Sequence, residues 1–147
     1  MPIDQLKRRE FVTLIGAVTA AWPLAARAQE SKRRVGVLLS GAADDPEMEV
    51  RLAEFLDELR RLGWTDGRNV RIDTRSEAGP HRAEELVALA PDVILASSSA
   101  SVTALQRITH TVPIVFANVI DAVGAGFVES LARPGGNITG FSAFNAA

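Results

Sequence analysis

The sequence predicts an α/β fold, in which a five-stranded parallel sheet is doubly wound and carries helices on both faces. Short apolar runs, for example Val93–Ala96 and Ile114–Ala117, alternate with longer stretches whose apolar residues recur at helical spacing. Connections of a few residues separate these stretches, and repeated βα units of this kind form parallel sheets. We expect the strand order 2-1-3-4-5, with a ligand at the carboxyl ends of the strands, beside the switch between the first and third strands.

The first strand and the first helix have the clearest signals. Val35–Ser40 is an apolar run, typical of a strand that is buried on both faces. Asp45 followed by Pro46 predicts the start of a helix with the aspartate as its N-cap. Gly63 predicts the end of that helix, because glycine readily adopts the left-handed conformation found there. The apolar positions of the helix are Met48, Leu52, Phe55, Leu59 and Leu62.

The remaining elements follow from the same signals. Alternation of apolar and polar residues over Asn69–Arg75 predicts an edge strand with one wet face. After it we expect, in order, a helix over about Pro80–Leu89, a strand over Val93–Ala96, a helix over Ala100–Ile108, a strand over Ile114–Ala117, a helix over Val123–Ala132 and a last strand over Ile138–Phe141.

The composition argues against several classes of function. The 147 residues suit one domain, and 16 Lys+Arg against 18 Asp+Glu give a net charge of −2, so nucleic acid is not an expected partner. The chain has no cysteine and two histidines, which excludes disulfides, a thiolate metal site and a multi-histidine metal centre. Ser40–Asp45 lacks the G-x-G-x-x-G pattern, and neither a P-loop nor a G-x-S-x-G motif occurs. We therefore expect no cofactor, no metal and no catalytic activity.

Residues 1–28 are predicted to be an export signal that is removed from the mature protein. A basic start precedes an uncharged apolar stretch, and a small-x-small pattern ends at Ala28, so we expect cleavage between Ala28 and Gln29. Arg8, Arg9 and Phe11 match the twin-arginine pattern, with the general secretory route as the alternative. Export through the twin-arginine machinery would place residues 29–147 in the periplasm.

The strand-end rule selects five candidate ligand-binding residues. Ser98 and Ser99 begin a predicted helix, where hydroxyl and N–H groups suit an anionic group. Asp121 follows a buried strand and suits an ammonium or hydroxyl group. Ser40 and Gly41 end the first strand, where small residues let a ligand approach the backbone. Serine and aspartate are also common N-caps, so a purely structural role stays open for the helix-start serines and for Asp121.

Several segments, in their order and spacing, resemble the substrate-binding proteins of ABC transporters in the type 1 periplasmic-binding superfamily. More narrowly, the chain resembles the tryptophan/tyrosine-type family of these proteins. The segments that carry the resemblance are Lys7–Phe11, Ala21–Gln29, Leu62–Asn69, Leu89–Ala96, Pro113–Phe116, Gly124–Val128 and Leu131–Phe141.

The resemblance implies a protein of two lobes, joined by crossing strands, that holds a small-molecule solute in the cleft between them. It implies capture of an amino acid or small organic acid and its delivery to an ABC permease in the inner membrane. The chain departs from the family pattern by stopping at Ala147, where the first lobe should lead into the second. We therefore expect residues 29–147 to form the N-terminal lobe alone. The alternative is a small exported α/β module that senses a ligand or acts as an enzyme.

Overall fold

The structure of the protein, a computed structural model, describes residues 32–144. Five strands form one sheet in the order β2-β1-β3-β4-β5, and every neighbouring pair is parallel. The predicted fold class and strand order are therefore confirmed. The strands are β1 (Arg33–Leu38), β2 (Val70–Arg75), β3 (Val93–Ala96), β4 (Ile114–Ile120) and β5 (Ile138–Phe144).

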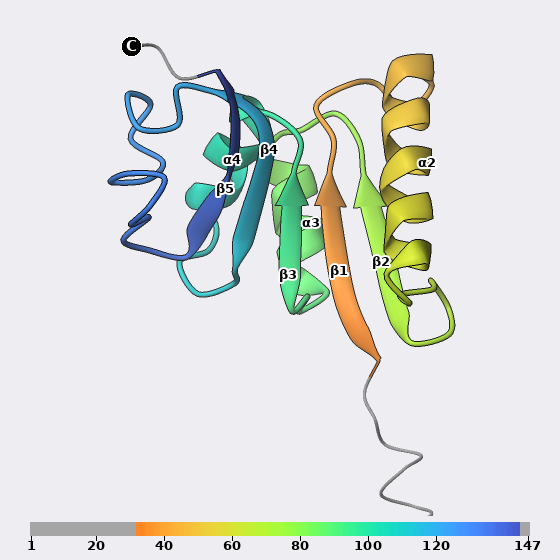
Figure 1. Cartoon of the computed structure of the whole chain (residues 1–147). Helices are drawn as coiled ribbons and strands as arrows, with labels where there is room; N and C mark the ends of the chain where they lie inside the picture. The colour runs from red at the N-terminus through yellow and green to blue at the C-terminus, as the bar shows by residue number, and fades with distance from the viewer. Residues whose placement is uncertain (1–31, 145–147) are drawn as a thin grey trace, which may run out of the picture. The chain divides into compact units, whose positions relative to one another are not determined.

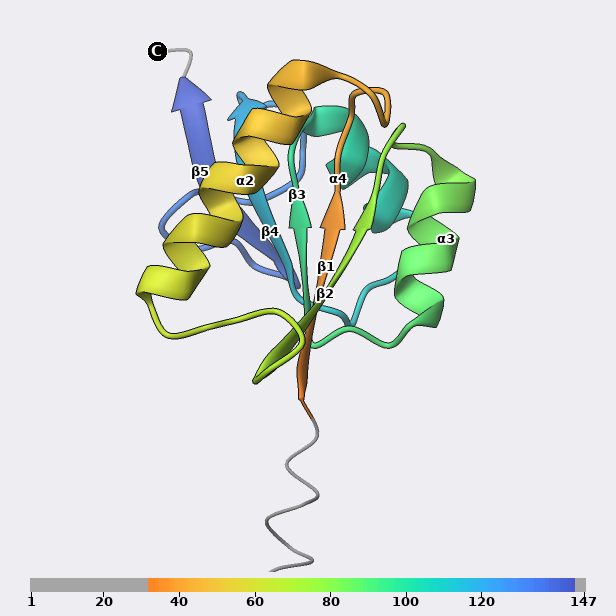
Figure 2. The ribbon, with the colours of Figure 1, turned by 90° about the vertical axis from the view of Figure 1, so that its right-hand side faces the viewer.

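The helices of this domain are α2 (Pro46–Arg61), α3 (Pro80–Ala88) and α4 (Ser99–Gln106). Helix α2 lies on one face of the sheet, whereas α3 and α4 lie on the other (Figures 1 and 2). None of these helices is long and apolar enough to cross a bilayer.

The best-packed part of the domain lies between the sheet and the pair α3 and α4. Each large apolar side chain that is fully buried there stabilises the fold by about 1.5–3 kcal/mol relative to an exposed position. The largest of these side chains are Leu38, Leu86, Ile94, Leu105, Ile114 and Phe116. They come from β1, α3, β3, α4 and β4, so this face joins most of the elements into one core.

Helix α2 begins and ends where the sequence predicts. The Asp45 carboxylate accepts a hydrogen bond from the backbone N–H of Glu47 at 2.9 Å, and Pro46 is the first helical residue. Gly63 follows the helix with a φ of +90°, the left-handed conformation expected of a C-terminal glycine.

No side chain of α2 is buried, and the helix stands over two cavities against the sheet. The larger, of about 400 Å³, lies beside Leu59 and Trp64 near the carboxyl end of the helix. The smaller, of about 230 Å³, lies beside Met48 and Phe55 and reaches the strands at Ala117. The α2 face of the sheet is therefore packed less closely than the opposite face.

The helix expected over Val123–Ala132 is absent, and that prediction was wrong. Turns and irregular backbone lead from β4 to β5 instead. Asp121 has a φ of +49° and Gly126 a φ of +74°, both in the left-handed region. Glycine in a helix interior costs about 1 kcal/mol relative to alanine, and this segment has a second glycine at Gly124. The apolar spacing alone does not overcome these costs.

Candidate functional site

The carboxyl ends of β1, β3 and β4 lie side by side, because these neighbouring strands are parallel. The backbone N–H of Ser40 donates to the hydroxyl of Ser97 at 3.2 Å, and the N–H of Ser97 donates to the carbonyl of Leu38 at 3.1 Å. The loop after β1 and the serine run after β3 are thus joined directly. The structure brings Ser40 and Gly41 close to this serine run, as the sequence predicts.

Gly41 has a packing role that the sequence did not indicate. A Cβ atom at this position would lie 2.6 Å from Cγ of Met48 and 2.9 Å from Oδ2 of Asp45. A larger residue there would require the side chains of Met48 and Asp45, at the start of α2, to shift. The small size of Gly41 serves this packing whether or not a ligand approaches.

The hydroxyl of Ser98 is engaged as the N-cap of α4. It accepts the backbone N–H of Ser101 at 3.2 Å and lies 3.1 Å from the Ser101 hydroxyl. The Ser101 hydroxyl is fully buried and donates to the carbonyl of Leu38 at 3.0 Å. These bonds fix the start of α4 against the end of β1 and give Ser98 the capping role.

The start of α4 keeps donors that have no partner among residues 32–144. The backbone N–H groups of Ser99 and Ala100 make no hydrogen bond there, and neither does the Ser99 hydroxyl. The first N–H groups of a helix lack intrahelical acceptors and carry the positive end of the helix dipole. This end of α4 can therefore bind an anionic group through Ser99 and the backbone.

Asp121 directly follows β4 and begins a tight turn. Its Oδ1 accepts the backbone N–H of Gly124 at 2.9 Å, and its carbonyl accepts the N–H of Ala125 at 3.0 Å. A Cβ at Gly124 would overlap Oδ2 of Asp121, so the turn requires glycine there. Oδ2 accepts no hydrogen bond from the described part of the chain. One carboxylate oxygen thus holds the turn and the other remains available.

Asn118 and Ser97 lie in the strand-end segments that the sequence selects, but neither was chosen as a candidate ligand-binding residue. Asn118 is exposed, has a φ of +59°, and lies at the register shift between Ala117 and Val119 in the pairing of β4 with β5. Bulges of this kind redirect a side chain and are common beside functional sites. Asn118 and Ser97 both line the smaller cavity under α2. The place of Asn118 at a strand end was one signal in the sequence, and the tolerance of asparagine for left-handed backbone was another.

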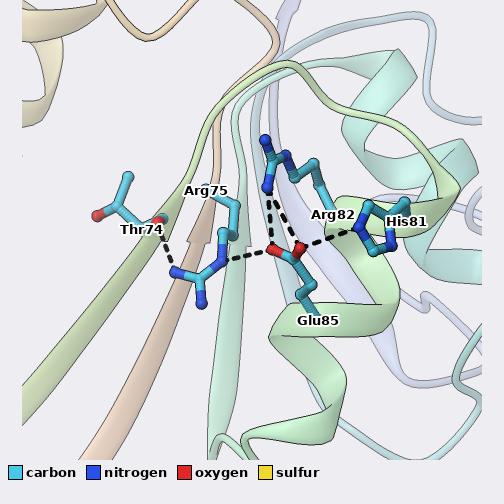
Figure 3. A network of polar contacts seen from close by, with 5 residues as sticks. All are labelled: Thr74, Arg75, His81, Arg82 and Glu85. Atoms are coloured by element: carbon cyan, nitrogen blue, oxygen red, sulfur yellow. Dashed lines mark hydrogen bonds and ion pairs between the residues drawn. The ribbon is translucent and has the colours of Figure 1, made fainter.

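A cluster of charged side chains lies between the end of β2 and α3 (Figure 3). Glu85 accepts from Arg75 Nε at 2.9 Å and from Arg82 Nη1 at 3.2 Å, and His81 Nε2 lies 3.1 Å from it. Arg75 also donates to the carbonyl of Thr74 at 2.9 Å. The hydrogen bond from Arg82, then that from Arg75, lowers the pKa of Glu85 below its ordinary value. The cluster ties α3 to the end of β2.

Arg8, Arg9, Phe11, Ala28 and Gln29, the predicted export and cleavage residues, lie outside the described residues. Within residues 32–144, no three or more histidine, aspartate or glutamate side chains gather in a way that could hold a metal ion.

Residues 34–147 match the family model described as ABC transporter substrate binding protein. The chain is also 31% identical over 118 residues to the tyrosine-binding protein of Clostridioides difficile strain R20291. That alignment covers 77% of this chain and 34% of the relative, so the chain spans about a third of the relative's length.

Solved structures agree with this family match. The ABC domain in complex with L-Trp from Streptococcus pneumoniae matches with a TM-score of 0.68 and 28% identity. The ligand-free, open structure of a substrate-binding protein with adhesive properties from Clostridium difficile matches with a TM-score of 0.69 and 28% identity. Each match covers 76% of this chain and 39% of the solved chain.

Proposed function

Because the chain belongs to the family of ABC transporter substrate-binding proteins, we propose that it captures an amino acid as the first lobe of a two-lobed protein and presents it to an ABC permease. One relative is a tyrosine-binding protein and one solved neighbour holds L-Trp, which supports an aromatic amino acid as the ligand. The observation that supports this proposal most directly is a set of hydrogen-bond donors and a carboxylate oxygen at adjacent strand ends, which have no partner within the described residues.

The ligand's carboxylate belongs at the start of α4. The N–H groups of Ser99 and Ala100 and the Ser99 hydroxyl have no other partner within the described residues, and all lie in the first turn of the helix. Hydrogen bonds to a charged acceptor each contribute about 1.5–3 kcal/mol, more than bonds between neutral groups. Ser98 supports this site indirectly, because its hydroxyl fixes the helix start.

The ligand's ammonium group belongs at Asp121. The free Oδ2 of this residue stands at the end of β4, next in the sheet to β3, which leads into α4. A negatively charged acceptor after β4 and a set of N–H donors at the start of α4, after β3, match the positive and negative charges of an amino acid. An organic acid without an ammonium group would leave Asp121 without a counterpart.

The ligand's side chain belongs in the smaller cavity under α2. Its lining is mainly apolar, including Leu39, Met48, Phe55 and Leu95, and its rim carries Asn118 at the strand ends. An apolar pocket with a few polar groups at one side is the usual form of a small-molecule site. An aromatic ring placed there would leave the charged groups of the ligand at the strand ends.

Titration of the isotope-labelled chain with L-tryptophan, followed by nuclear magnetic resonance, tests this arrangement. We expect the amide signals of Ser99, Ala100 and Gly124 to move most. One lobe contacts one side of the ligand, so we expect a Kd of about 1 mM or weaker. Tryptamine, which lacks the carboxylate, should leave the first two signals in place. Signals that stay fixed with L-tryptophan in large excess would overturn the proposal.

Asp121→Asn is a matched test of the ammonium site. The amide oxygen can still accept the N–H of Gly124, whereas the negative charge is lost. We expect the affinity for L-tryptophan to fall about tenfold, and the affinity for indole-3-propionate, which has no ammonium group, to stay the same. Asp44→Asn, which neutralises an exposed carboxylate in the loop between β1 and α2, is the control. Equal binding of L-tryptophan by Asp121→Asn and the unaltered chain would reduce Asp121 to a turn residue.

Residues 1–28, as proposed here, deliver the domain across the inner membrane, after which cleavage leaves Gln29 at the amino terminus. Proteins of this family typically act outside the cytoplasm, which supports an export signal. The paired arginines Arg8 and Arg9 favour the twin-arginine machinery and a periplasmic location.

A further inference from the structure

The larger cavity under α2 lies at the opposite end of the sheet from the candidate site. Arg33, Val70 and Val93 are the first residues of β1, β2 and β3, and all three line this cavity. The candidate site lies at the other ends of the parallel strands. A volume of about 400 Å³ is within the range found for small-molecule sites, about 300–1,000 Å³. The cavity is therefore large enough to hold a ligand of its own.

Hydrogen bonds brace the wall of this cavity at Trp64. The backbone N–H of Trp64 donates to the carbonyl of Leu59 at 2.8 Å. The Asn69 side chain accepts the N–H of Thr65 and donates to the carbonyl of Gly63, both at 2.8 Å. Trp64 is nevertheless 42% exposed, so its indole ring has surface that a ligand can cover. The wall is thus formed before any ligand binds, which favours binding.

The polar groups of this cavity that have no hydrogen-bond partner are donors. The Arg33 side chain makes no hydrogen bond within residues 32–144, and its Nη1 lies 3.6 Å from Oδ1 of Asp92 in an ion pair. The indole N–H of Trp64 also has no partner in that part of the chain. Asp92 is the one carboxylate among the described lining residues, and its Oδ2 already accepts the N–H of Arg34 at 2.7 Å. A ligand that brings an acceptor, rather than an ammonium group, suits this set.

We propose that the larger cavity is a second ligand site, which binds the hydrocarbon chain of an aliphatic carboxylate and holds its carboxylate group at Arg33. A guanidinium group presents paired N–H donors that match the two oxygens of a carboxylate. The apolar part of the lining, against which the hydrocarbon chain packs, consists of Val35, Leu59, Trp64, Val70 and Val93. No described residue lines both cavities, so this site does not depend on the proposed capture of an amino acid.

The fluorescence of Trp64 tests the proposal with octanoate, which neither absorbs nor emits where tryptophan does. In the full chain, Trp22→Phe leaves Trp64 as the single tryptophan. At neutral pH we expect a saturable blue shift with a Kd of about 0.1 mM, because the hydrocarbon chain replaces water at the indole ring. Octanamide, which is uncharged, should bind about tenfold more weakly. No saturable shift at up to ~10 mM octanoate would overturn the proposal.

Arg33→Gln removes the charge that the carboxylate requires. We expect its affinity for octanoate to fall about tenfold and its affinity for octanamide to stay the same. Arg107→Gln is the matched control and should bind octanoate normally, because Arg107 is an exposed arginine after α4, on the other face of the sheet. Equal octanoate binding by Arg33→Gln and the unaltered chain would overturn the proposal.

Nuclear magnetic resonance locates the bound octanoate. The amide signals of Val35, Val70 and Val93 should move, whereas those of Ala117 and Asn118, beside the smaller cavity, should stay in place. Shifts confined to Ala117 and Asn118 would put octanoate in the smaller cavity and overturn the second site. Binding of octanoate without any binding of L-tryptophan would instead contradict the proposed function and support the second site.

Discussion

Ser98 lies at the start of α4, where substitution should separate stability from binding. Its hydroxyl caps the helix, whereas the proposed ligand contacts are the next two backbone N–H groups and the Ser99 hydroxyl. Ser98→Ala removes the cap and leaves those donors free. Ser98→Asp keeps a cap and brings a carboxylate beside the same donors. Ser98→Ala should therefore lower the stability and keep ligand binding, whereas Ser98→Asp should keep the stability and lose ligand binding.

The cap accounts for the size of the expected change in stability. Replacing serine by alanine at an N-cap costs about 1 kcal/mol, and aspartate caps about as well as serine. In a domain of this size, 1 kcal/mol corresponds to a fall in Tm of about 4 °C. The loss of the contact between the Ser98 and Ser101 hydroxyls adds to this cost in Ser98→Ala. Ser98→Asp should unfold within about 1 °C of the unaltered chain.

Circular dichroism melting and the L-tryptophan titration give the two measurements. Ser98→Ala should melt lower but still shift the amides of Ser99 and Ala100, whereas Ser98→Asp should melt normally and lose the response. Unchanged L-tryptophan binding by Ser98→Asp would refute the assignment of these amides to the carboxylate. A Tm for Ser98→Ala equal to that of the unaltered chain would refute the capping argument.

Three further substitutions test other parts of the structure. Glu85 has a lowered pKa, so its contribution to stability is complete above its ordinary pKa of 4.5 and is lost as the pH falls below that value. The Tm difference between the unaltered chain and Glu85→Gln should therefore shrink between about pH 6 and pH 3. A Tm difference that stays constant over this range would contradict the argument. Gly140→Ala would overlap the carbonyl oxygen of Phe116 and should cost about 3 kcal/mol in urea unfolding, whereas no loss would show that β4 and β5 can shift apart. Replacing Arg8 and Arg9 together with lysine should stop export, as measured by the intact mass of periplasmic protein beginning at Gln29; normal export of this variant would favour the general secretory route.

The sequence predicted the fold because each strand has a short apolar run and the first helix has clear end signals. Asp45 and Gly63 act through local backbone chemistry, so one sequence suffices to place them. The missing helix after β4 shows the limit of periodicity. The left-handed backbone of Asp121 and its hydrogen bond to Gly124 outweigh apolar spacing there, and a residue pattern does not indicate which local bond forms.

The candidate site was predictable in place and less so in detail. The parallel order of the strands brings Ser40, Ser98 and Asp121 to one edge, and this follows from topology alone. Which polar groups of the site cap a helix or turn, and which have no partner within the described residues, depends on individual rotamers and hydrogen bonds. Asn118 enters the cavity lining through a register shift between two strands, and a pairing register is not visible in one sequence. The cavity itself depends on how closely α2 approaches the sheet.

The uneven packing of the two faces has a consequence for hydrogen exchange. α4 buries Ser101, Val102, Ala104 and Leu105, whereas α2 buries no side chain. Segments with few buried apolar groups open at a lower free energy than the whole domain. The amides of α2 should therefore exchange through a partial opening, whereas those of α4 and the central strands should exchange only through global unfolding. In that open state water reaches the apolar lining at Leu95 while the sheet and its opposite core stay intact.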